Sequence, residues 1–127
     1  MEKIKSSFIL LAFIFLSSCY KQLEMEGFEK EQWQQALKEC NTYRVDVANT
    51  IIKNQDVLLE ATQNEVESLL GQPEEHELYN RNQKFFHYRL TPQSDCGPHE
   101  TVQFLSVRFN AIGRANLVQV MLREPKT

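Results

Sequence analysis

The stretch that decides the fold is Thr62-Gln-Asn-Glu-Val-Glu-Ser-Leu-Leu-Gly-Gln-Pro73. Thr62 and Glu65 have the spacing of a capping box, in which each side chain accepts a hydrogen bond from the backbone N–H of the other residue at a helix start. Gly71 suits the positive-φ position that ends a helix, and Pro73 blocks any continuation. Between these signals the apolar residues recur three or four positions apart: Val66, Leu69 and Leu70. The stretch therefore predicts a short helix with one buried face.

Upstream of this stretch, residues 29–53 contain no Gly or Pro, and their apolar side chains recur at helical spacing. These side chains are Trp33, Leu37, Cys40, Val47 and Ile51. We expect one long helix, or two helices with a break near Asn41. Arg44 lies on the apolar stripe: either its stem packs while the guanidinium reaches solvent, or it pairs with an acidic group or a carbonyl of the domain, and the sequence leaves both open.

Downstream of Pro73 the apolar period changes from 3.6 to 2, which predicts strands. The expected strands are 76–80, 84–90, 101–109 and 114–123, with turns at 80–83 and 110–113 and a loop over 91–100. Their inner faces are expected to carry Phe86, Tyr88 and Leu90, then Leu105, Val107 and Phe109, then Val118, Val120 and Leu122. Phe85 and His87 fall on the opposite face, which we expect to be an open docking surface. The order predicts an α+β fold, with the N-terminal helices packed on one face of a three- to four-stranded antiparallel sheet.

The first eighteen residues have the layout of a secretory signal peptide. Lys3 and Lys5 precede the apolar run 8–16, whose nine residues are too few for the ~20 that span a bilayer. The next residues, Leu16-Ser-Ser-Cys19, resemble the lipobox of bacterial lipoproteins, in which cleavage leaves a lipidated cysteine as the first residue. The alternative is a plain signal peptide cleaved near Ser18. We expect a signal peptide over 1–18, a lipidated tether over 19–27 and one domain over 28–124, with Cys19 holding the chain to membrane lipid.

The other two cysteines, Cys40 and Cys96, form an even pair in a chain with an export signal, so we expect a disulfide. The alternative is a metal site, because Cys96 and His99 have ligand-like spacing, but a second ligand pair is missing. His76 lies between carboxylates, which is typical of a solvated charge run and less often of a metal or proton-transfer site. The sequence therefore predicts no metal and no cofactor.

Together these features resemble the BamE/SmpA-type small lipoproteins of Gram-negative bacteria and, more broadly, the fold of β-lactamase-inhibitor-protein domains. The resemblance covers roughly residues 57 to 122, apart from the lipobox at Cys19. It rests on Thr62-Gln-Asn-Glu-Val66, Leu70-Gly-Gln-Pro73, Phe85-Phe-His-Tyr88 and the hairpin Leu105-Ser-Val-Arg-Phe-Asn-Ala-Ile-Gly113. Glu60-Ala61 replaces the family's Gly-Met pair. The arrangement of Phe28, Trp33, Cys40, Arg44 and Cys96 is similar to uncharacterised lipoproteins of the Bacteroidetes type.

The resemblance implies a non-enzymatic lipoprotein of the outer membrane that faces the periplasm and binds or stabilises envelope or outer-membrane proteins. The alternative is an inhibitor or ligand-binding module that acts on an envelope enzyme. An enzyme is a third hypothesis, although the chain has no nucleophile elbow, zinc signature or phosphate loop. The formal net charge of −3 and the lack of a basic stripe argue against a nucleic-acid partner.

Overall fold

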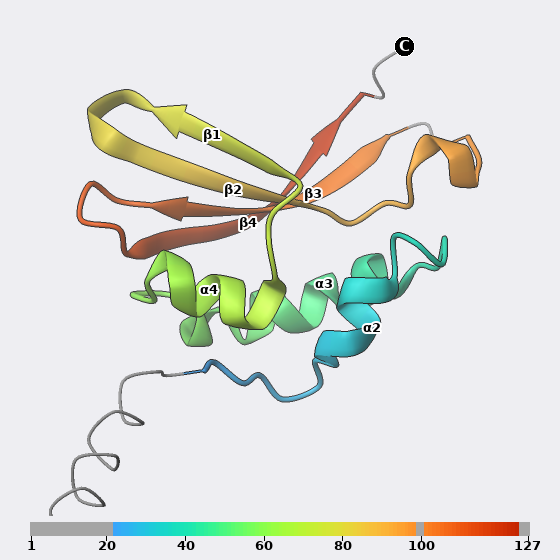
Figure 1. Ribbon diagram of the computed structural model, residues 1–127, viewed down its shortest axis with the longest axis horizontal. Helices are drawn as coiled ribbons and strands as arrows, with labels where there is room; N and C mark the ends of the chain where they lie inside the picture. The colour runs from blue at the N-terminus through green and yellow to red at the C-terminus, as the bar shows by residue number, and fades with distance from the viewer. Residues whose placement is uncertain (1–21, 99–100, 125–127) are drawn as a thin grey trace, which may run out of the picture.

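The computed structural model describes residues 22–98 and 101–124, which form a helical layer on one face of a four-stranded antiparallel sheet (Figure 1). The helices are α2 (Lys30–Gln35), α3 (Tyr43–Lys53) and α4 (Gln63–Leu70). The strands are β1 (Glu75–Tyr79), β2 (Gln83–Arg89), β3 (Val102–Phe109) and β4 (Ala115–Arg123), and they lie in sequence order in the sheet. This is the α+β class that the sequence predicted. Cys19, the predicted signal peptide and His99 lie outside the described residues.

Helix α4 begins and ends as the sequence predicted. The Thr62 N–H donates to Glu65 Oε1 at 3.2 Å, and the Glu65 N–H donates to Thr62 Oγ1 at 3.2 Å. These reciprocal bonds satisfy two donors that no carbonyl inside the helix can reach. At the other end Gly71 has a φ of 78°, a value that a residue with a Cβ rarely adopts.

The chain between residues 29 and 53 forms two helices rather than one. Residues 36–42 separate α2 from α3, and Cys40 in this break has a positive φ of 55°. The Asn41 side chain accepts the backbone N–H of Tyr43 at 3.0 Å, so it satisfies a donor at the start of α3. The break therefore lies where the sequence allowed it, near Asn41.

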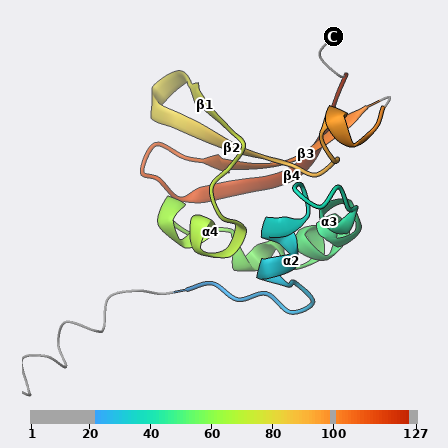
Figure 2. The same ribbon diagram turned by 45° about the vertical axis from the view of Figure 1, so that its right-hand side comes forward.

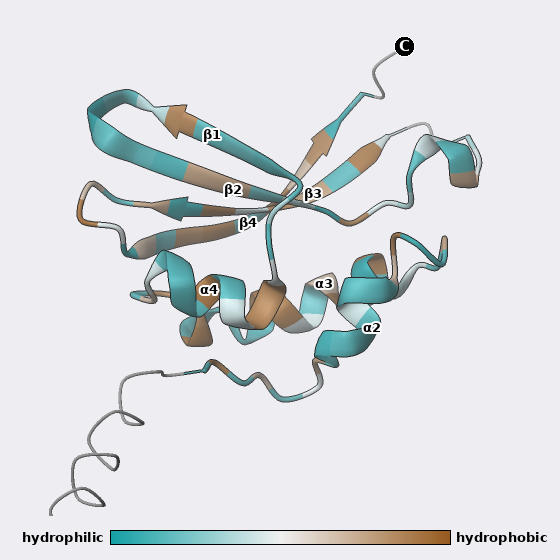
Figure 3. Ribbon diagram, viewed as in Figure 1, coloured by the Kyte–Doolittle hydropathy of each residue, from teal (hydrophilic) through white to brown (hydrophobic). Residues whose placement is uncertain are grey.

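The core lies between the helices and the inner face of the sheet, where apolar and polar residues alternate along the strands (Figure 3). Its largest fully buried side chains include Trp33, Ile51, Leu58, Leu70, Phe86, Tyr88, Leu90, Leu105, Val107 and Phe109. In β4, Val118 is buried opposite Val107, but Val120 is 40% exposed and Leu122 is 65% exposed. The strand register confirms that all three lie on the inner face, but only Val118 is covered, because β4 is an edge strand.

The N-terminal described segment passes along the side of the helices that faces away from the sheet (Figures 1 and 2). Met25 is buried in the core cluster, and the Leu23 N–H donates to Ser68 Oγ at 3.3 Å. Residues 23–25, which the sequence assigned to a tether, thus pack against the helical layer. No helix within 22–98 and 101–124 has the length and apolarity needed to cross a bilayer.

Candidate functional site

The candidate site is the face of the sheet that no described helix covers, which we call the outer face (Figures 1 and 2). Strand alternation and register place the following side chains on it: Glu75, Glu77, Tyr79, Phe85, His87, Phe104, Ser106, Arg108, Leu117, Gln119, Met121 and Arg123. The outer face therefore combines aromatic, sulfur-containing and charged groups.

His87 lies at the centre of the outer face and is only 2% exposed. Its ring stacks on Phe85 with centroids 5.6 Å apart and meets Phe104 edge-on at 6.5 Å. Its Nδ1 lies 2.6 Å from Ser106 Oγ, and its Nε2 lies 2.8 Å from Glu77 Oε2. The expectation of an exposed His87 is wrong, because neighbouring side chains within the sheet bury it without a second layer.

The Ser106, His87 and Glu77 side chains form a continuous polar chain, which superficially resembles a nucleophile with its base and acid. Ser106 is buried, however, and its hydroxyl also lies 3.2 Å from the sulfur of Met121. A nucleophile has to reach the reacting carbon of a substrate, and this hydroxyl is enclosed by side chains. The chain of bonds is better suited to fixing the orientation of the aromatic rings on the outer face.

Two arginines lie across the aromatic rings of the outer face. The Arg123 guanidinium lies 4.4 Å from the Phe104 ring centroid and pairs with Glu75 at 2.7 Å. The Arg108 guanidinium lies 6.0 Å from the Phe85 centroid, and its Nε donates to Gln83 Oε1 at 2.9 Å. Cation–π contacts of this kind hold the two guanidinium groups over the aromatic rings of the outer face.

A pocket of ≈ 270 Å³ lies at one end of the outer face. Its apolar lining is Val102 and Phe104, and its charged lining includes Arg89, Arg123 and Glu75. The Arg89 guanidinium is held by the carbonyls of Thr91 and Pro92, at 2.8 and 3.0 Å. The pocket is therefore an amphipathic recess in which hydrogen bonds hold the Arg89 side chain in place.

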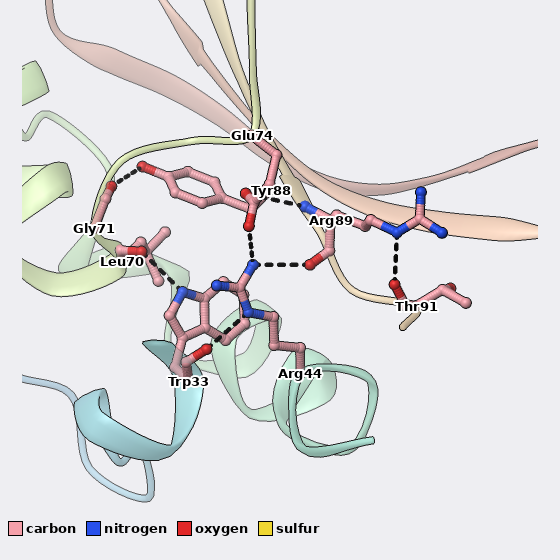
Figure 4. Close-up of polar contacts among 8 residues, drawn as sticks. All are labelled: Trp33, Arg44, Leu70, Gly71, Glu74, Tyr88, Arg89 and Thr91. Atoms are coloured by element: carbon pink, nitrogen blue, oxygen red, sulfur yellow. Dashed lines mark hydrogen bonds and ion pairs between the residues drawn. The ribbon is translucent and has the colours of Figure 1, made fainter. Parts of the chain in front are cut away.

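On the opposite side of the sheet, Arg44 joins the two layers (Figure 4). Its side chain is buried and forms an ion pair with Glu74. It donates from Nε to Trp33 O at 2.8 Å and from Nη1 to Arg89 O at 2.9 Å, and its guanidinium lies 4.4 Å from the Trp33 ring centroid. Of the two readings that the sequence left open, pairing within the domain is the correct one. The partners lie on α2, on the segment before β1 and at the end of β2, so Arg44 fixes the sheet against the helices.

The C-terminal carbonyls of α4 are also satisfied by side chains in this region (Figure 4). The Trp33 indole donates to Leu70 O at 2.8 Å, and the Tyr88 hydroxyl donates to Gly71 O at 2.9 Å. Burial raises the pKa of Tyr88, the nearby carboxylates of Glu67 and Glu74 raise it further, and Arg44 lowers it. The Tyr88 hydroxyl therefore remains protonated at neutral pH and keeps its donor role.

The two predicted disulfide residues lie together. The sulfur atoms of Cys40 and Cys96 are 1.99 Å apart, with their Cα atoms at 5.5 Å. The bond links the break between α2 and α3 to the loop that follows β2. His76 is exposed, and its ring centroid lies 4.7 Å from that of the Phe86 ring. Within the described ranges, no group of three or more His, Cys, Asp and Glu side chains is arranged to hold a metal ion.

Sequence reasoning had identified Phe85 and His87 as members of the candidate site and had missed the rest of it. The alternation of β3 and β4 gave a signal for Phe104, Ser106 and Met121, but only the strand order shows that they neighbour His87. The chain matches no protein-family model, no curated protein and no solved structure. The BamE/SmpA-type assignment therefore stays a prediction from its residues.

Proposed function

We propose that this chain is a non-enzymatic lipoprotein, held to the outer membrane by lipid on Cys19 and facing the periplasm, that binds an envelope protein through the outer face of its sheet. The proposal joins the lipobox sequence to one structural observation. The N-terminal described segment and the outer face lie on opposite sides of the helical layer (Figures 1 and 2).

That observation bears on how an anchored molecule would be oriented. Only three residue steps separate Cys19 from Gln22, a reach of at most about 11 Å of extended chain. A lipidated Cys19 would therefore keep the membrane on the side of the N-terminal segment. The helices would lie next to the bilayer, and the outer face would point away from it toward partners in the compartment.

The chemistry of the outer face suits a protein partner. Tyr, Phe, Met and Arg are enriched at protein interfaces, where rigid aromatic area and bidentate charge supply most of the binding energy. Tyr79 and Leu117 are exposed on this face, next to rings that His87 and the two arginines hold in place. A partner would meet a pre-ordered surface and would lose little side-chain entropy on binding.

The test is affinity capture from detergent extracts of native membranes, with bound proteins identified by mass spectrometry. The outer-face variant is Leu117→Arg, and the matched control is Ile112→Arg, which is also exposed but lies in the β3–β4 turn. We expect an envelope protein that the wild type and the control recover and that Leu117→Arg loses. Equal recovery by both variants would exclude the outer face.

The anchor is tested separately, by the intact mass of the membrane-bound protein and by fractionation of Cys19→Ala. We expect acyl groups on the wild type and release of the variant from the membrane. An unmodified cysteine in membrane fractions would refute lipidation without bearing on the outer face.

A second candidate function is an inhibitor or ligand-binding module, favoured by the ≈ 270 Å³ pocket between Arg89, Arg123 and Phe104. Such a recess has room for one side chain of an envelope hydrolase. A stoichiometric complex with a hydrolase that loses its activity on binding would favour this function over a scaffold.

A further inference from the structure

Strand β4 has one edge that is mostly unpaired within the described structure. β4 is the last strand of the sheet. On the side away from β3, the Glu60 N–H donates to Ala115 O at 2.7 Å and the Ala115 N–H donates to Ala61 O at 2.8 Å. These bonds occupy only the start of the strand. Residues 117–123 continue beyond them with no further strand in the sheet.

The amino-acid composition of β4 is unusual for a strand whose edge faces solvent. Soluble proteins commonly protect edge strands with charged side chains, which discourage pairing with another chain. No charged residue occurs from Ala115 to Leu122, and Val120 and Leu122 are exposed. The other edge strand, β1, carries Glu75 and Glu77 within five residues and is protected in the usual way.

We propose that a second copy of this chain pairs with residues 117–123 of β4, antiparallel and about a two-fold axis at Val120. Val120 is the centre of the free edge, so this register uses all of it and leaves the bonds of Ala115 intact. Val120 then meets the Val120 of the second copy, and Val118 meets its Leu122. The exposed Val120 side chains of the two copies then cover each other, and each exposed Leu122 packs beside the buried Val118 of the other copy.

Charge favours pairing of two copies through β4 over pairing through β1. In the proposed register Arg123 lies opposite Leu117 of the second copy, so no like charges meet across the pair. The same operation on β1 about its central residue would place Glu77 opposite Glu77, which is destabilising. Val120 and Leu122 are the exposed helix-facing side chains of residues 117–123, and this register puts each of them against an apolar side chain of the second copy.

The two-fold axis would run normal to the sheet, because antiparallel neighbours in a sheet keep the same faces on the same side. Both helical layers would lie on one side and both outer faces on the other, forming one continuous surface. The two N-terminal segments would emerge on the same side, which suits two anchors in one membrane. Only this last step rests on the proposed function; the pairing itself does not.

The first test is site-specific crosslinking in the full chain in mild detergent, with Cys19→Ala so that the introduced thiol is the only free one. Directly opposed residues have Cα atoms about 4.5–5.5 Å apart, within disulfide range. Val120→Cys is expected to form a covalent dimer on mild oxidation. The control is Leu122→Cys, whose two copies would lie about 14 Å apart in this register although Leu122 is the more exposed residue. Faster crosslinking of Leu122→Cys, or none of Val120→Cys, would overturn the proposal.

The second test is sedimentation velocity over a range of protein concentrations. Val120→Arg places two guanidinium groups opposite each other and is expected to weaken dimerisation at least tenfold. Leu78→Arg, at an exposed position on β1, is expected to leave it unchanged. Circular dichroism checks that both variants fold. If Val120→Arg does not fold, the comparison of Val120→Cys with Leu122→Cys decides the question. A wild type that is monomeric at every concentration would show that this edge is free or takes another protein's strand.

Discussion

Replacing Arg44 by Met tests whether the polar contacts of this buried arginine hold the helices to the sheet. Met keeps an unbranched stem in the same space and removes the guanidinium. The carbonyls of Trp33 and Arg89 lose their donor, and each unsatisfied buried carbonyl costs roughly 1–3 kcal/mol. The Glu74 side chain is 24% exposed, so water can solvate its carboxylate and offset part of the cost of losing the ion pair with Arg44. We expect a net destabilisation of about 3 kcal/mol, at the lower end of the range for breaking a buried ion pair.

The measurement is urea unfolding followed by circular dichroism, since the fluorescence of Trp33 will itself respond to the loss of the overlying guanidinium. The matched control is Arg114→Met. Arg114 is exposed and donates to the Glu60 carbonyl at 3.2 Å, so its loss should change stability by no more than about 0.5 kcal/mol.

A double-mutant cycle with Glu74→Gln separates the ion pair from the carbonyl contacts. We expect Glu74→Gln alone to cost about 1 kcal/mol and the coupling to Arg44→Met to be about 1–2 kcal/mol. The reasoning would be refuted if Arg44→Met lowered the free energy of unfolding by an amount within about 0.5 kcal/mol of the change caused by Arg114→Met, because surface substitutions fall in that range. Zero coupling would show that the carbonyls carry the whole effect.

Three further predictions concern the disulfide, the start of α4 and Tyr88. Alkylation without prior reduction should leave Cys40 and Cys96 unmodified, and replacing both by Ser should cost up to about 4 kcal/mol for their 56-residue separation. Thr62→Ala should lower stability by about 1 kcal/mol, whereas Thr42→Ala should not, since only the first threonine makes a side-chain cap hydrogen bond. The pKa of Tyr88 is raised on folding. The neutral hydroxyl therefore contributes its full stabilisation below the unfolded pKa of about 10. Above that pH the contribution falls by up to about 1.4 kcal/mol per pH unit. Stability curves from pH 9 to 11.5 should therefore be flatter for Tyr88→Phe than for the wild type, and parallel curves would contradict the burial argument.

The candidate site shows why only part of it could be predicted. Alternation identifies which residues of β2 share a face, so Phe85 and His87 were correctly placed together on the outer one. Alternation gives no information on neighbours across strands. His87 is buried by Glu77, Phe104 and Ser106, which come from other strands and depend on the register.

In β4, too, the alternating pattern could not predict which side chains are buried, because the strand lies at the edge of the sheet. Val118, Val120 and Leu122 alternate identically in sequence, and only Val118 is buried. An apolar pattern shows which side of a strand would favour burial. The strand order and the extent of the helical layer decide whether anything covers that side.

The sequence by itself determined the features whose interactions are local. Thr62 and Glu65 are three positions apart and make the capping box without help from the rest of the chain. The α+β order follows equally from periods of 3.6 and 2. The tertiary structure decided the partners of Arg44, which lie 11, 30 and 45 positions away. It also decided the burial of His87 and the free edge of β4. Contacts between residues so far apart in sequence depend on how the layers meet, and no local pattern records that.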